Sequence, residues 1–441
     1  MRRIRSPTSS TVTMSSERPK SSFEIASISL FGLMMTANVV NYIYQVVMGN
    51  VLSVTDFGAL NAIQAFITIA GIPAGAFLMI ASRATAQESI RKNRGKLSAT
   101  LSPIISMSVF FGLAMTVLCL ALSMSIASWL QLDNTSVVAI ATLFVGFNCV
   151  FNSLCGILQG GDQLNHYGGA QVASMLSKLA FSLFFVIAGL NLIGAMAGIV
   201  IAPVFAGLYC AICIARHLPF SFTFTGISKT LSLLKPLRNL LILQVVLAVF
   251  TNGDILLVKA LFSPEVAGAY SSGMVLGKIP LFASSALVGV LFPFVAASST
   301  NGGNTLRLLW KAIGYGSIIA IACSLALCIF GKPLIDLFFG ERYTSSIGYL
   351  PAVSALALSL TLVTIVANFA AASNRMGFFN ASGAIGVAVS AGFITIWHPN
   401  ATSVILVLAC IIAIIAIANL IHIMLQARSS DQTWPKRRRP L

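Results

Sequence analysis

The sequence contains few charged residues. Only 9% of its 441 residues are charged and 57% are hydrophobic, with a mean hydropathy of +0.92. Soluble domains carry about 25% charged residues, so a water-soluble chain of this length could not hide so much apolar surface. The apolar runs reach about 20 residues or more without two-residue alternation, which excludes a transmembrane β-barrel. The composition therefore predicts an all-α protein that lies in lipid.

The sequence also lacks the motifs of enzyme chemistry. It contains neither a G-x-x-x-x-G-K-[ST] phosphate loop nor an H-E-x-x-H zinc motif. Its four histidines are scattered near the ends of apolar runs. Its eight cysteines lie inside such runs, where Cys210 and Cys213 form a C-x-x-C that is best explained as small apolar filler. We therefore expect no enzyme activity, no metal and no cofactor.

The apolar runs predict twelve transmembrane helices of a polytopic protein. They cover residues 25–48, 56–82, 99–130, 137–158, 169–190, 191–214, 240–262, 268–297, 310–330, 346–372, 377–397 and 402–425. Proline removes a backbone donor and tends to kink a helix. Kinks are expected at Pro73, Pro203, Pro280, Pro293 and Pro351.

Six spans lie on each side of a basic linker near the middle of the chain. We expect a basic cytosolic tail at 1–24, an N-terminal lobe at 25–214, the linker at 215–239, a C-terminal lobe at 240–425 and a second basic tail at 426–441. Each lobe then holds six helices, so both lobes enter the membrane from the same side.

The two halves of the chain are weakly alike. Residues 47–62 align with residues 257–272 at a shift of 210 residues. The matched pairs are Ser53 with Ser263, Gly58 with Gly268 and Ala59 with Ala269. A parallel repeat of this kind predicts two pseudo-symmetric lobes with a cleft between them.

The basic residues predict how the chain crosses the membrane. With the N-terminus inside, the inner segments collect 22 of the 27 lysines and arginines, and the outer loops collect two, Lys332 and Arg342. Such an excess marks the cytosolic side. Both termini are therefore expected in the cytosol, and the net charge of +16 needs no nucleic-acid partner to explain it.

Polar side chains recur at helical spacing inside several spans, so each set lies on one helix face. They are Asn38, Asn41 and Gln45 in the first span, Asn61, Gln64 and Thr68 in the second, Asn148, Asn152, Cys155 and Gln159 in the fourth, and Thr361, Thr364 and Asn368 in the tenth. A single set would suit hydrogen bonds between helices. Sets in both halves favour a wetted cavity.

Four charged residues lie within predicted spans away from their first turns: Lys178, Asp254, Lys259 and Lys278. A charge at mid-bilayer costs ~2.5–3.5 kcal/mol and is a candidate functional group. Asp254 and Lys278 are expected roughly 12 and 15 Å from the same face, at 1.5 Å per residue. Asp254 is the candidate coupling group, paired with Lys278 or with Lys259. Such a pair either only neutralises charge or belongs to a cationic cavity that its one acid tunes.

Three stretches carry a family resemblance: "YIYQVVMGNVLSVTDFGALNA" (42–62), "GILQGGDQLNHYGGAQVASMLSKLAF" (156–181) and "DILLVKALFSPEVAGAYSSGMVLGKIPLFASSALVGVLFPFVA" (254–296). In order and spacing, they resemble the polysaccharide-transporter, or oligosaccharide flippase, branch of the multidrug/oligosaccharidyl-lipid/polysaccharide exporter superfamily. The resemblance covers nearly the whole chain.

The resemblance implies a multi-pass flippase of the bacterial inner membrane that works by alternating access. Its substrate would be an undecaprenyl-pyrophosphate-linked oligosaccharide for capsule, exopolysaccharide or O-antigen, and polysaccharide polymerase or export machinery would be its protein partners. Lys178, Lys278 and Arg83 would then bind the pyrophosphate. Contacts with the sugars would come from Asn38, Asn41, Tyr42, Gln45, Asn61, Gln64 and Asn152.

Other classes of function remain as alternatives. A cation-coupled multidrug antiporter of the same superfamily would favour acids in its cavity, whereas three lysines and one acid lie in these spans. A membrane-embedded polysaccharide polymerase would need a large external loop, which is absent from the predicted topology. A scaffold without transport would not need the sets of polar residues.

Overall fold

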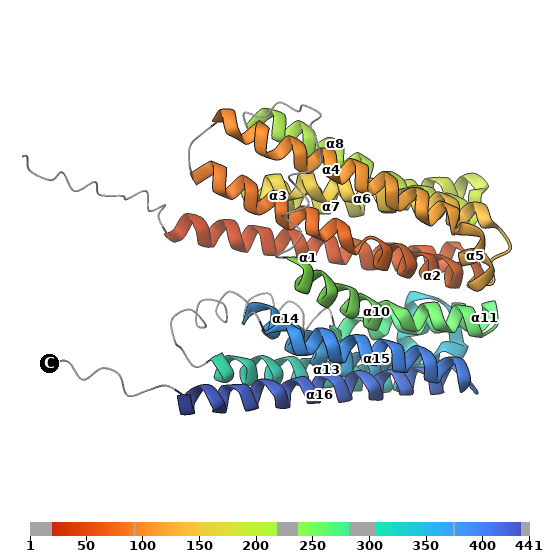
Figure 1. Ribbon diagram of the computed structural model, residues 1–441. Coiled ribbons are helices and arrows are strands. Elements are labelled where there is room, and N and C mark those ends of the chain that lie inside the picture. Colours follow the sequence, from red (N-terminus) through yellow and green to blue (C-terminus); the bar gives the residue numbers. More distant parts are fainter. Residues whose placement is uncertain (1–19, 91–93, 218–236, 282–304, 374, 434–441) are drawn as a thin grey trace, which may run out of the picture.

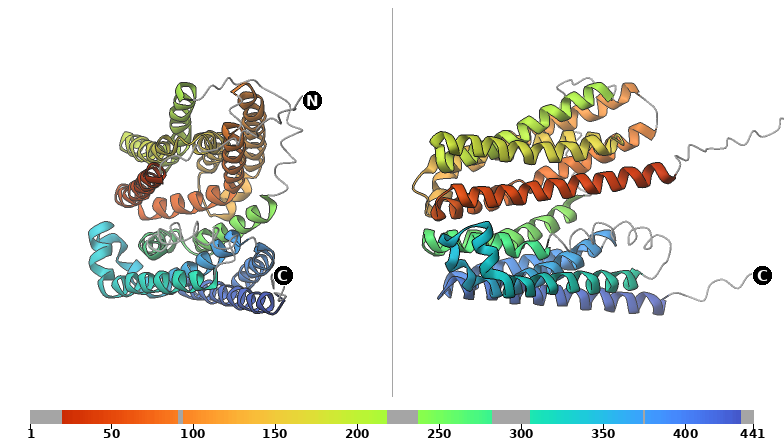
Figure 2. Two further views of the ribbon diagram at one scale, coloured as in Figure 1. Left: turned by 90° about the vertical axis from the view of Figure 1, so that its left-hand side faces the viewer. Right: turned by 180° about the vertical axis from the view of Figure 1, so that it is seen from behind.

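The computed structural model describes residues 20–90, 94–217, 237–281, 305–373 and 375–433. This part of the chain is helical between short turns and contains no strand, which confirms the all-α class. Figure 1 shows the helices gathered into two bundles, α1 to α8 in one and α10 to α16 in the other, and both views in Figure 2 keep this division. The protein is therefore built from two helical lobes.

The N-terminal lobe contains eight α-helices and one short π-helical segment. They are α1 (Lys20–Val51), α2 (Val54–Ala70), α3 (Ile72–Ile90), α4 (Arg94–Ala121), α5 (Ser123–Trp129), α6 (Thr135–Gly160), α7 (Leu164–Phe185), η1 (Val186–Leu190) and α8 (Asn191–His217). Within this lobe α7 packs along both α1 and α8, and α6 packs on α3, α4 and α8.

The C-terminal lobe contains fewer described helices. They are α10 (Arg238–Leu261), α11 (Pro264–Gly277), α13 (Thr305–Phe338), η3 (Glu341–Tyr349), α14 (Leu350–Ala372), α15 (Met376–Ile396) and α16 (Ala401–Thr433). Here α14 packs on α13 and α16, and α15 packs on α10 and α16. The start of α1 and the end of α16 lie at the same end of the molecule, which we call the tail end (Figure 1). The opposite end is called the closed end.

Nine stretches of the described chain are long and apolar enough to cross a membrane, or ten if the bent pair α2 and α3 is one span. One of the nine, Leu164–His217, contains both α7 and α8. This stretch breaks at Gly189, where φ is 90°, and its two helices pack along each other, so it holds two of the predicted spans. The predicted span 268–297 lies partly outside the described residues.

The predicted proline kinks are only partly found. A bend of 44° separates α2 from α3, and Gly71 at the break precedes Pro73 by two residues. Pro203 lies inside the continuous helix α8, and Pro351 occupies the first turn of α14, where a missing N–H costs nothing. Pro280 comes just after α11. Pro293 lies outside the described residues.

The matched residues of the two halves occupy matched positions. Ser53 is the N-cap of α2 at φ −63° and ψ 159°, and Ser263 is the N-cap of α11 at φ −62° and ψ 154°. Gly58 and Gly268 meet each other where α2 packs on α11, because a Cβ on Gly58 would lie only 2.7 Å from the backbone nitrogen of Gly268. The repeat seen in the sequence thus places α2 and α11 together between the lobes.

We predict that the tail end faces the cytosol, since α1 begins and α16 ends there and the sequence beyond both helices is rich in basic residues. A reporter that works only in the cytosol should be active when it is fused after His217, and a reporter that works only outside should be inactive there. Asp133 and Pro399 lie in turns at the closed end. At these two positions the reporter that works only outside should be active, and the cytosolic reporter should be inactive. The reverse pattern at all three positions would invert the proposed orientation.

Candidate functional site

Three adjoining cavities lie within and between the lobes. The N-lobe cavity has a volume of about 390 Å³ and is lined by residues of α1, α2, α6, α7 and α8. The polar interlobe cavity, about 190 Å³, lies between α1 and α2 of one lobe and α10 and α11 of the other. The apolar interlobe cavity, about 620 Å³, is lined mainly by residues of α3 and α10 together with residues of α2, α6 and α14. Thr68 lines all three, so the three cavities meet around this residue.

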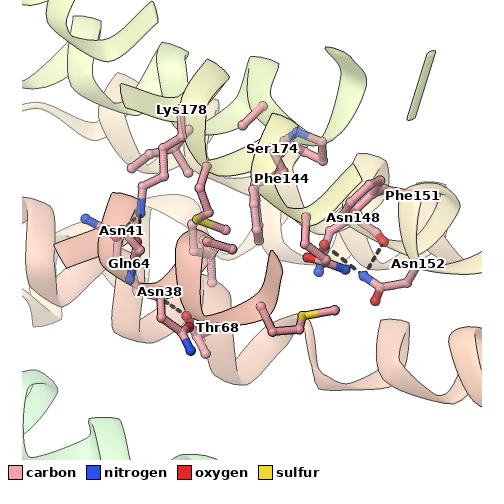
Figure 3. A pocket seen from close by; sticks show the side chains of 18 residues that line it. Asn38, Asn41, Gln64, Thr68, Phe144, Asn148, Phe151, Asn152, Ser174 and Lys178 are labelled. Carbon is pink, nitrogen blue, oxygen red and sulfur yellow. Dashed lines mark hydrogen bonds between the residues drawn. The ribbon is translucent and has the colours of Figure 1, made fainter. Parts of the chain in front are cut away.

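Lys178 is the central cation of the N-lobe cavity. It projects from α7 toward Asn41 and Gln64, as Figure 3 shows. Its Nζ donates hydrogen bonds of 3.0 Å to Asn41 Oδ1 and of 3.0 Å to Gln64 Oε1, and it lies 3.9 Å from the centre of the Tyr44 ring. The side chain is only 8% exposed. Its charge is therefore held by neutral dipoles and a ring face rather than by a carboxylate.

The lysine also determines how the neighbouring amides are oriented. An ammonium group only donates hydrogen bonds, so the amide oxygen of Gln64 must face Lys178 and its amide nitrogen must face away. Gln45 Nε2 donates to the same oxygen at 3.5 Å. Three buried polar atoms of this wall then have no hydrogen-bond partner among the described residues: Gln64 Nε2, Gln45 Oε1 and Tyr42 Oη. They supply a donor, an acceptor and a hydroxyl to a polar ligand.

Asp254 and Lys278 form a second charged group, in the C-terminal lobe. Lys278 Nζ donates to Asn252 Oδ1 at 3.3 Å, and both residues line the polar interlobe cavity. Asp254 is 1% exposed, and Tyr270 Oη donates to its Oδ2 at 2.5 Å. The hydrogen bonds of the two charges go to Asn252 and Tyr270 rather than to each other, and their direct pairing stays a prediction.

Most of the predicted site residues come together in these cavities. The polar interlobe cavity is lined by Asn38, Asn41, Tyr42, Gln45, Asn61, Gln64 and Lys278. The N-lobe cavity shares three of these and adds Lys178 and Asn152. Arg83 is placed differently, because its side chain is exposed in the last turns of α3 and lines none of the three cavities.

The expected pairing of Asp254 with Lys259 is not formed. The two residues are five positions apart on α10, which turns their side chains by about 140° from each other. Lys259 instead points to the closed end, where its Nζ donates to the carbonyl oxygen of Gln131 at 3.3 Å. Asp254 faces Tyr270 on α11.

Sequence reasoning missed several residues of the site. Tyr44, Asn252 and Tyr270 contact the buried charges. Asn252 lies two residues before Asp254, and Tyr270 lies 16 residues after it. A separation of 16 residues does not by itself predict that two side chains are in contact. Tyr44 belongs to the buried face of α1 rather than to its polar set, so only the packing of α7 on α1 reveals it.

Comparison with known proteins gives a family and a fold. The model of the family described as "Polysaccharide biosynthesis protein" matches residues 26–299, which is more than half of the chain. No curated protein sequence matches it. Several solved structures share its fold.

An inward-facing multidrug resistance MATE family transporter of the MOP superfamily aligns with a TM-score of 0.77 and 13% identity, over 93% of this chain and 99% of its own. The lipid II flippase MurJ, in an inward closed conformation, aligns with a TM-score of 0.69 and 14% identity, over 91% and 87%. The eukaryotic MATE transporter AtDTX14 aligns with a TM-score of 0.66 and 14% identity, over 90% and 96%. Identities this low establish the fold alone.

Lys178→Met is predicted to remove anion binding by the N-lobe cavity. The variant keeps an unbranched side chain but loses the charged ammonium group that donates hydrogen bonds to Asn41 and Gln64. Binding of inorganic pyrophosphate to the purified protein, measured by calorimetry, should weaken at least about tenfold, or ~1.4 kcal/mol. Lys311→Met removes an exposed lysine of α13 and should leave binding unchanged. Equal binding by the wild type and Lys178→Met would contradict the prediction.

Tyr270→Phe is predicted to destabilise the protein by about 1.5–3 kcal/mol, because it removes a hydrogen bond to a buried carboxylate. Tyr349→Phe is the matched control, since its ring packs on Tyr270 with centroids 6.1 Å apart and its hydroxyl bonds to none of the described residues. Thermal unfolding of the purified variants measures the difference. A Tyr349→Phe protein as unstable as Tyr270→Phe would show that the hydrogen bond to Asp254 is not the cause of the destabilisation, because both variants keep the ring and only Tyr270→Phe loses that bond.

Proposed function

Because this chain belongs to the polysaccharide biosynthesis protein family of the MOP exporter superfamily, we propose that it is a flippase for lipid-linked oligosaccharides. Its substrate is an undecaprenyl-pyrophosphate-linked repeat unit of a surface polysaccharide. The flippase moves this unit from the inner to the outer leaflet of the bacterial inner membrane. It performs transport and makes or breaks no covalent bond of the substrate.

One observation carries the proposal: Lys178 is buried in the N-lobe cavity, and its partners among the described residues are all neutral. A buried cation is usually paired with an acid, since desolvation is costly. An unpaired one is suited to an anion that comes and goes, and a pyrophosphate is such an anion. Lys278 on the opposite lobe lies beside the same polar wall of α1 and α2.

The rest of the site is suited to sugars and to the lipid. Sugar hydroxyls both donate and accept hydrogen bonds, and the wall of the polar cavity offers unpartnered atoms of both kinds. The adjoining apolar cavity, with Leu240, Leu247 and Leu281 in its lining, has room for the first units of the polyprenyl chain. The remainder of that chain stays in the bilayer.

The arrangement of the lobes supports alternating access. The lobes contact each other at the closed end through α2, α10 and α11, and the apolar interlobe cavity lies toward the tail end. This state receives substrate from the tail end, which is the predicted cytosolic side. Opening the closed end would then release the substrate to the other side.

A cation-coupled multidrug antiporter is the second candidate, because two of the aligned structures are MATE transporters. The lining of the three cavities argues against it. None of their described lining residues is an aspartate or a glutamate. A cationic drug would therefore meet two lysines and no compensating acid.

Deletion of the gene should abolish the surface polysaccharide and leave lipid-linked repeat units on the cytosolic side. A plasmid carrying the wild type or Lys311→Met should restore the polysaccharide, whereas Lys178→Met should restore little of it while reaching the membrane in equal amount. Immunoblotting of the polysaccharide and chromatography of the lipid-linked pool measure both effects. An intact polysaccharide together with new drug sensitivity in the deletion strain would favour the antiporter instead.

A further inference from the structure

Arg342 belongs to the few basic residues in the predicted outer loops, and its side chain contacts the other lobe. It lies in η3 of the C-terminal lobe, but its guanidinium donates to main-chain carbonyl oxygens at the end of α1. Nη1 donates to Leu52 O at 3.2 Å, and Nη2 donates to Gly49 O at 2.7 Å. Nη2 also donates to Asn50 O. Three oxygens of the N-terminal lobe are thus held by one side chain of the other.

The end of α1 needs such a partner. The last carbonyl groups of a helix have no partners within it and carry the negative end of the helix dipole. A basic residue in the last turn commonly satisfies them, but the last turn of α1 contains none. Arg342 supplies the missing cation from the opposite lobe, so this capping exists only while the lobes are together.

A cluster of aromatic rings lies directly beneath this contact. Tyr343 is fully buried and donates from its hydroxyl to Gly49 O at 3.0 Å. Its ring lies 5.9 Å from that of Phe57 on α2 and 5.6 Å from that of Phe339. Gly49 leaves space for Phe339, because a Cβ at this position would lie 2.6 Å from the ring. The rings therefore fit only against a glycine.

The same pattern recurs across the closed end. Asn50 Nδ2 donates back to Phe338 O at 2.6 Å. Lys259 of the C-terminal lobe donates to Gln131 O at 3.3 Å, and Gln131 Nε2 donates to Ala260 O at 2.9 Å. Gln131 follows closely after the end of α5. In both places a cation of the C-terminal lobe meets carbonyl oxygens at or just after a helix end of the N-terminal lobe.

We propose that Arg342 and Gly49 form a latch that stabilises the state in which the closed end is shut. Arg342 is a positioning residue: it contacts no substrate and sets the balance between the two states of the carrier. Release of the latch uncaps α1 and separates the rings from Gly49, which opens the cavity at this end. The inference rests on alternating access as part of the proposed function, but it does not depend on the substrate.

Arg342→Gln tests the latch on the full-length protein in lipid nanodiscs. Hydrogen–deuterium exchange read by mass spectrometry should show about a tenfold larger open population, equal to ~1.4 kcal/mol, in peptides covering residues 44–58 and 338–350. Peptides covering 71–79 and 240–248, toward the tail end, should exchange more slowly. Lys332→Gln removes an exposed lysine of the same lobe near the same end and should change neither. Exchange in Arg342→Gln equal to that in Lys332→Gln would overturn the proposal.

Gly49→Ala tests the latch without changing charge. Its methyl group would collide with Phe339 when the closed end is shut, so the same peptides should exchange faster as in Arg342→Gln. Gly32→Ala lies on the same helix, with no atom within 4 Å of the added Cβ, and should exchange like the wild type. Equal exchange in the two alanine variants would overturn the role of Gly49.

Arg342→Lys separates the latch from a merely structural arginine. Lysine retains the charge but cannot direct a planar fork at three oxygens, so exchange should fall between the wild type and Arg342→Gln. If the lysine variant exchanges like the glutamine variant, charge at the helix end has no part in the latch. Surface polysaccharide in the same strains reports the proposed function separately, because exchange measures the shut state whether or not the substrate is an oligosaccharide.

Discussion

The close approach of α2 and α11 at Gly58 and Gly268 is the contact on which the rest of the site depends. A side chain on either glycine would run into the backbone of the opposite helix, so the two repeats meet here with backbone against backbone. The same two helices separate further along, where Gln64 and Lys278 line the polar interlobe cavity. Tight packing at one end thus leaves space for a cavity beside it. Larger residues at the glycines would hold the helices apart along their whole length.

The lobes differ in how they carry charge, although their helices repeat. Lys178 in the N-terminal lobe is held by amide oxygens and a ring, whereas Lys278 in the C-terminal lobe is attracted by Asp254. The position that matches Lys178 after the shift of 210 residues is Ala388. Attraction for an anion is therefore strongest in one lobe. Because a ligand moves a carrier only if the two states bind it differently, a site whose cations lie on separate lobes has the required property: motion of the lobes changes the distance between Lys178 and Lys278.

The sequence predicted the helical class, the repeat and most of the polar wall, because these depend on patterns within single helices. Periodicity places Asn38, Asn41 and Gln45 on one face wherever the helix packs. It fails where partners come from elsewhere in the chain. Asp254 and Lys259 do not pair because the rotation along α10 separates them. Arg83 is exposed and lines none of the three cavities, and a role for it in binding the pyrophosphate stays a prediction. Arg342 was counted only as an outer charge, since nothing within η3 indicates the end of α1.

The contacts at the closed end explain how this end of a carrier can be held shut and yet open at a small cost in free energy. Breaking a buried ion pair strongly destabilises a protein, because each charge is left without a partner in a low dielectric. The contacts of Arg342 and Lys259 join a cation to carbonyl oxygens, and Arg342 is exposed at the surface. When these contacts separate, water can replace the protein partner of Arg342 and of the carbonyl groups of α1, so the net cost of opening is much smaller than the gross strength of the bonds. In the cavity the ligand supplies the group that compensates the buried Lys178, whereas at the gate Arg342 is exposed and water can satisfy its charge in either state.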